Sequence, residues 1–153
     1  MSDIDKTVQK IQEHQHNIEK WEQEIEQETE RYKFRLKDYD SKVKDHSDTL
    51  SKEQDAFAVA QQHQDEGAMS IHQHAIDKAR YEVDYWTEQA KEEDQKQARL
   101  LDGLRDQIER EKGKISELES QLSKLQTEEE QKKDKRKQQA MQAFASTVDH
   151  PNQ

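Results

Sequence analysis

Seven histidines are the side chains of this sequence best suited to binding a metal ion, and their spacing argues against a metal site. On a helix, two ligands share a face when they are three or four residues apart. His14 and His16 are two residues apart, as are His72 and His74, so the members of each pair point about 200° away from each other. The chain has no cysteine, and no His-Glu-x-x-His pattern accompanies the histidines. We therefore expect solvated histidines, with no metal and no cofactor.

Catalytic chemistry has no candidate residues either. The sequence shows no nucleophile with its base, no phosphate-binding loop and no cofactor motif. Hydrophobic residues make up 29% of the chain and charged residues 39%, which is too little apolar material for a core that encloses a small-molecule substrate. The sequence thus predicts no enzyme.

The elements that position these side chains are two long helices with heptad repeats. In the first half the repeat carries Ile4, Ile11, Ile18, Ile25, Tyr32 and Tyr39, and the second seam position carries Val8, Leu36, Val43, Leu50 and Phe57. After Gly67 the seam continues through Ile76, Val83, Ala90, Leu101, Leu104, Ile108, Ile115, Leu118, Leu122 and Leu125. Such repeats are typical of coiled coils, which bury one narrow stripe per helix.

The two repeats mirror each other about Gly67, which favours a hairpin over a parallel dimer. Partners whose numbers add to 133 place seam against seam, as with Ile18 and Ile115. The polar pairs are then Glu53 with Arg80, His46 with Thr87, and Glu22 with Glu111. A half-buried His46 would be either a simple interruption of the stripe or a group sensitive to pH near about 6.

The fold predicted is all-α: a long antiparallel two-helix coiled-coil hairpin with a C-terminal helical extension. We expect a first helix over 1–63, a turn over 64–70, a second helix over 71–130 and a basic, amphipathic, partly flexible extension over 131–153. Ser2 with Asp5 and Ser70 with Gln73 have the spacing of capping boxes. Gly67 is expected to supply the positive φ of the turn, and helicity should persist to about residue 145.

One candidate partner-binding surface is the basic run near the C-terminus. It consists of Lys132, Lys133, Lys135, Arg136 and Lys137, with Phe144 beyond it. The run could bind an acidic protein, an anionic membrane or nucleic acid, or it could be ordinary solvated surface. We favour a protein, because the apolar stretch is short and rich in alanine and because a net charge of −10 disfavours nucleic acid.

A second candidate surface is an aromatic flank. Trp21, Trp86 and Leu100 share one flanking heptad position, and Tyr81 and Tyr85 point further outward. A two-helix coiled coil leaves such residues in water, and exposed aromatic clusters often mark contact surfaces. We therefore predict a docking face for a second hairpin or for another protein. The alternative for Trp21 is a cation–π contact with Lys114.

The expected location is intracellular. The start of the chain has no apolar run that resembles a secretory signal, and no stretch approaches the roughly 20 apolar residues of a membrane span. We expect a soluble cytoplasmic protein.

The function predicted is structural: a non-enzymatic scaffolding coiled coil that braces or spaces a larger protein assembly. In length and hairpin layout the whole chain also resembles the export-stalk proteins of flagellar and type III secretion ATPases. That resemblance is one of fold and rests on no motif, and it implies a stalk or adaptor of a motor or secretion ATPase. A third and weaker possibility is a membrane or nucleic-acid binder that acts through Lys132–Lys137.

Overall fold

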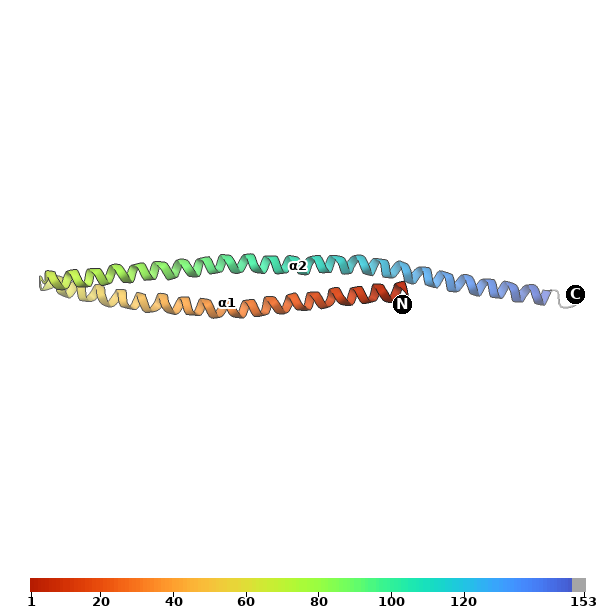
Figure 1. Cartoon of the computed structure of the whole chain (residues 1–153), viewed down its shortest axis with the longest axis horizontal. Helices are drawn as coiled ribbons and strands as arrows, with labels where there is room; N and C mark the ends of the chain where they lie inside the picture. Colours follow the sequence, from red (N-terminus) through yellow and green to blue (C-terminus); the bar gives the residue numbers. More distant parts are fainter. Residues whose placement is uncertain (150–153) are drawn as a thin grey trace. The chain divides into compact units, whose positions relative to one another are not determined.

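Two long helices make up the computed structural model, which describes residues 1–149. Helix α1 spans Asp3–Gln62 and helix α2 spans Glu66–Asp149. They pack side by side and run in opposite directions (Figure 1). No strand occurs among the described residues. The prediction of an all-α antiparallel hairpin is confirmed, whereas the end predicted for the extension falls partly on 150–153, outside the described residues.

The start of α1 is capped as its sequence predicts. The backbone N–H of Asp5 donates to Oγ of Ser2 at 3.1 Å, and the N–H of Ser2 donates back to Oδ2 of Asp5 at 3.4 Å. These two bonds satisfy backbone donors that have no partner within the first helical turn.

The turn is shorter than predicted and does not depend on Gly67. Gln64 takes the positive φ, 52°, and no glycine among the described residues has one. The N–H of Asp65 donates to the carbonyl of Ala60 at 3.0 Å, and that of Gln64 to the carbonyl of Gln61 at 3.1 Å. This pair of bonds is the Schellman motif that closes helix C-termini. The prediction of a turn over 64–70 is therefore wrong.

Helix α2 begins earlier than expected because Asp65 caps it. Oδ1 of Asp65 accepts the backbone N–H of Ala68 at 3.1 Å, so the predicted cap at Ser70 lies inside the helix. Gly67 is part of the first helical turn, and α2 runs on to Asp149 rather than to about 145.

The pairing register differs from the predicted one by about one heptad. In the part that contains the turn, Gln23–Leu104, Glu53 contacts His72 and the rings of Tyr39 and Trp86 stack. Both pairs have numbers that add to 125 rather than 133. Because the seam positions of a heptad repeat recur every seven residues, two such helices can pair seam to seam in registers about seven residues apart. The turn lies earlier than predicted, and its position selects the register observed here.

The polar pairs that followed from the old register are consequently wrong. Glu53 contacts His72 instead of Arg80, and His46 lies near Glu82 instead of Thr87. In the part formed by residues 1–22 and by α2 from Arg105 onward, Glu111 contacts His14. Glu22 is exposed.

The core is thin, as two helices dictate. The buried apolar residues are Ala60, Ile76, Ala79 and Leu104 in the part that contains the turn, and Ile11 and Ile108 in the other. The second seam position near the start of α1 is Thr7, which is 8% exposed, and not Val8, which is 36% exposed. Thr7 is tolerated there because its hydroxyl donates to the carbonyl of Asp3 at 2.8 Å.

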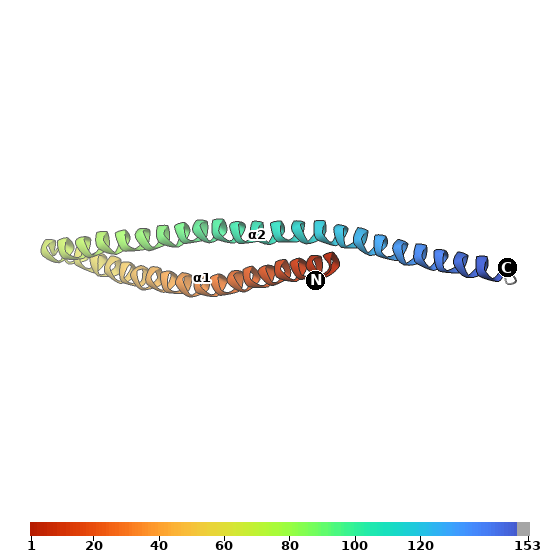
Figure 2. The same cartoon turned by 45° about the vertical axis from the view of Figure 1, so that its right-hand side comes forward.

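Helix α2 continues past the first residues of α1 (Figures 1 and 2). The start of α1 lies beside α2 around residue 125, where Ser2, Asp3 and Ile4 line a small hollow with Leu125, Glu128, Glu129 and Lys132. We call residues 133–147 the extension. They are helical and every one is exposed.

Candidate interaction surfaces

Three histidines cross the seam to carboxylates instead of facing water. His14 contacts Glu111, Nδ1 of His72 lies 2.6 Å from Oε2 of Glu53, and Nε2 of His46 lies 3.7 Å from Oε2 of Glu82. The three rings are half-buried, so the expectation of solvated side chains is wrong for His14 and His72, whereas His46 was expected to be half-buried at the seam. His16, His63 and His74 are exposed.

These contacts are pairs, not clusters. Across residues 1–149, no group of three or more histidines and carboxylates is arranged to hold a metal ion. What the pairs can do is select the partner residue across the seam, because each histidine meets its carboxylate in one register only.

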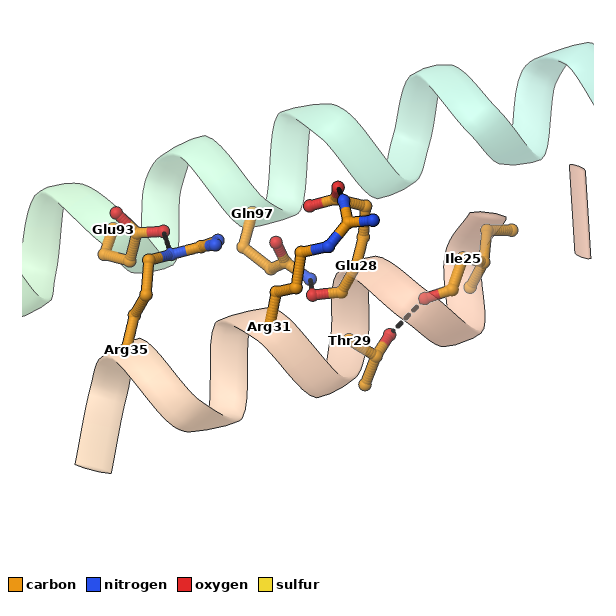
Figure 3. Close-up of polar contacts among 7 residues, drawn as sticks. All are labelled: Ile25, Glu28, Thr29, Arg31, Arg35, Glu93 and Gln97. Atoms are coloured by element: carbon orange, nitrogen blue, oxygen red, sulfur yellow. Dashed lines mark hydrogen bonds and ion pairs between the residues drawn. The ribbon is translucent and has the colours of Figure 1, made fainter. Parts of the chain in front are cut away.

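The middle of the seam is also polar (Figure 3). Nε of Arg35 lies 2.5 Å from Oε1 of Glu93, and Nε2 of Gln97 donates to the backbone carbonyl of Glu28 at 3.4 Å. Gln97 is only 6% exposed, and its Oε1 has no hydrogen-bond partner. A buried polar atom without a partner costs stability, so this stretch is a weak point of the packing.

Tyr32 belongs to the same polar stretch. Its hydroxyl donates to Oδ1 of Asp94 on the opposite helix. That hydrogen bond, followed by partial desolvation and the negative charges of Asp94, Glu93 and Asp40, raises the pKa of Tyr32 to about 12. The phenol is therefore held in its neutral, donating form.

Trp86 lies in the hairpin's own packing. Its ring stacks on Tyr39 of α1 at 5.7 Å between centroids and meets Tyr85 edge-on at 4.9 Å. Nζ of Lys42 lies 3.9 Å from the centroid of the ring, and Nε1 donates to Oε2 of Glu82 at 3.2 Å. The expectation that Trp86 lies in water is wrong. The cation–π contact expected between Trp21 and Lys114 stays a prediction, and the contact that the structure shows joins Lys42 and Trp86.

The rest of the aromatic flank is more open. Tyr81 is 67% exposed and stacks on Tyr85 at 6.3 Å, while Tyr85 and Leu100 are each 43% exposed. Trp21 is half-buried. Partner binding through these residues stays a prediction.

The basic run lies on bare helix. Lys132, Lys133, Lys135, Arg136 and Lys137 are exposed. Within the described chain, none of these five side chains forms an ion pair with a carboxylate. Met141 and Phe144 follow at 71% and 72% exposure. Three residues apart, these two apolar side chains share one face of the helix.

Comparisons with family models, curated proteins and solved structures found no match. In the part of the chain that the structure describes, neither helix contains a stretch long and apolar enough to cross a membrane.

Sequence reasoning missed the residues that complete the seam. Glu82, Glu93 and Asp94 look like surface carboxylates in the sequence, yet each meets a side chain of α1. Glu111 was expected at the seam, but opposite Glu22 instead of His14. The sequence does contain these complementary residues on the two helices. They come opposite each other only when the turn is placed at residues 63–65.

Proposed function

We propose that this protein is a structural coiled coil that joins a larger protein assembly through its C-terminal extension. The observation that carries the proposal is that α2 runs on as a single helix beyond α1 while Met141 and Phe144 are 71% and 72% exposed. Isolated helices of this length are marginal in water unless an apolar face is packed. A partner that covers the face would supply that packing.

A protein partner fits this face better than a small molecule. Met141 and Phe144 lie on one exposed face of a single helix, and a large aromatic side chain contributes on the order of 150–250 Å² when it is covered. The basic residues just before the apolar pair would sit at the rim of such an interface, where charge guides encounter and orientation.

Crosslinking mass spectrometry on the full chain in native lysate tests the proposal. We expect intermolecular crosslinks from the lysines of the run, and their loss in the variant Met141→Ser with Phe144→Ser. The matched control is Gln138→Ser with Gln142→Ser, which changes two exposed polar residues of the same helix. An identical crosslink pattern in both variants would contradict a role for the apolar pair.

A further inference from the structure

The extension carries a stripe of three residues at four-residue spacing. Lys133, Lys137 and Met141 follow one another at i, i+4 and i+8, so neighbours lie on the same face of α2. All three are exposed. We call them the basic stripe.

Helix α1 carries the complementary stripe at the same spacing. Glu26, Glu30 and Phe34 are four residues apart, and all three are exposed, with Phe34 at 79%. We call them the acidic stripe. Both of its carboxylates line a solvent-open hollow, together with Gln23, Gln27 and Arg31.

The two stripes match residue by residue when the helices lie parallel. Lys133 then faces Glu26, Lys137 faces Glu30, and Met141 faces Phe34. Two pairs of oppositely charged side chains are followed by a contact between a thioether and an aromatic ring, which is favourable for methionine. In the antiparallel direction Met141 faces Glu26 and Phe34 faces Lys133, so the match is lost.

We infer that the basic stripe of one molecule docks on the acidic stripe of a second copy of this chain. The inference rests on the proposed function and names the partner of the extension. Each copy carries both stripes. The extension cannot fold back onto its own α1, because α2 continues as one helix to Asp149.

Charge supports the same occupant. Segment 132–137 contains five basic residues and one acidic residue, Asp134, so its net charge is +4. Because the whole chain has a net charge of −10, the remaining residues carry a net charge of −14. Glu22–Glu30 contains five glutamates and no basic residue. Two of these glutamates, Glu28 and Glu30, also contact Arg31 and Lys33 of the same helix, which leaves the segment an excess of negative charge. A second copy therefore offers the extension an acidic surface, whereas two extensions would repel each other.

Sedimentation velocity on the full chain tests the inference. We expect association beyond the 18.2 kDa monomer at low salt, weakened as salt rises from about 0.05 M to about 0.5 M because exposed charges are screened. Lys133→Glu with Lys137→Glu should weaken self-association by about tenfold or more, since two ion pairs become repulsive. Glu26→Lys with Glu30→Lys should do the same.

The decisive step is to mix the two charge-reversed variants. In the mixture the two reversed stripes can pair with each other and the two unchanged stripes can pair with each other. Association should therefore return to the wild-type level, although each variant alone associates more weakly by about tenfold or more. Circular dichroism of each variant should show unchanged helicity. The matched control is Lys132→Glu with Lys135→Glu, which reverses the same charge at positions that are neither three nor four residues from Lys133 or Lys137 and should weaken association much less.

Three results would overturn the inference. They are a wild-type chain that stays monomeric at low salt, a mixture that does not recover, and a control that is as weak as the stripe variant. If the chain stays monomeric while Met141→Ser with Phe144→Ser still abolishes crosslinks to a different protein, the second copy is wrong and the proposed function stands. Binding to vesicles of anionic phospholipid by a monomeric chain would contradict both.

Discussion

The ring of Trp86 on α2 stacks on the ring of Tyr39 on α1, with 5.7 Å between centroids and 26° between planes. This contact joins the helices at a position where sequence reasoning placed a free docking residue. Aromatic pairs contribute beyond their buried area, and Lys42 and Glu82 add a cation–π contact and a hydrogen bond.

Trp86→Ala should therefore destabilise the hairpin itself. We expect a loss of about 2 kcal/mol in the free energy of unfolding, below the roughly 3–5 kcal/mol typical of truncating a fully buried tryptophan, because the ring is only half-buried. Tyr81→Ala, at a ring that is 67% exposed, should change it by less than about 0.5 kcal/mol. Thermal unfolding followed by circular dichroism measures both. A Trp86→Ala chain of unchanged stability that no longer binds a partner would restore the docking role.

The turn predicts that replacing Gly67 stabilises the chain, whereas replacing a glycine that supplies a positive φ usually destabilises it. Gly67→Ala should stabilise the chain by roughly 0.5–1 kcal/mol, because Gly67 is helical and alanine is the better helix former. An added Cβ would meet only Oδ1 of Asp65 at 3.6 Å, an ordinary contact. Gln64→Gly should also stabilise, because glycine suits a positive φ. A destabilised Gly67→Ala chain would place the turn at residue 67 after all.

His14 and Glu111 supply a third prediction. Glu111 is 9% exposed and His14 is the side chain that it contacts. His14→Ala should lower the free energy of unfolding by about 1–3 kcal/mol, since it leaves a buried carboxylate unpaired. Glu111→Leu should cost less or even stabilise, because an apolar side chain at a seam position needs no partner. Equal losses in chemical denaturation would contradict this reading of the pair.

Tyr32 predicts how stability changes in alkali. Its pKa is raised from 10.0 to about 12, first by the hydrogen bond to Asp94. A raised pKa means that the neutral phenol stabilises the fold. This contribution is complete below the unfolded pKa of about 10 and is lost as the pH rises through about 12. Ultraviolet titration of phenolate should show one tyrosine that titrates late, and Asp94→Asn should bring it back toward 10. A wild-type chain whose tyrosines all titrate together near 10 would remove the Tyr32–Asp94 bond.

The sequence predicted the helices well and their alignment poorly, for one physical reason. Heptad spacing reports which face of a helix is buried, so the fold class and most seam residues followed from Ile4, Ile11 and their repeats. It leaves the alignment undetermined by whole heptads. The turn decides that alignment, and Gln64 carries no signal for a positive φ, whereas Gly67 carries a strong one that the chain does not use.

The predictions about surface residues also succeeded where they did not depend on the register and failed where they did. Residues on bare helix, such as Lys133 and Phe144, are exposed, and the predicted register also left them without a partner on the first helix. The surroundings of Trp86 and the histidines depend on which residues lie opposite, and these changed when the register moved by one heptad.

The register is central to this account, because it decides which side chains meet across the seam and where α1 stops beside α2. Two double-cysteine variants measure it directly. Glu53→Cys with His72→Cys joins residues that contact each other, whereas Glu53→Cys with Arg80→Cys joins residues that would meet only in the register one heptad away. Position 80 lies eight residues beyond position 72, about 12 Å along the helix axis, too far for a disulfide, whose Cα atoms lie within about 7 Å. Under dilute oxidising conditions the first variant should form an intramolecular disulfide and the second should stay reduced. The reverse result would contradict the register, and with it the length of the extension.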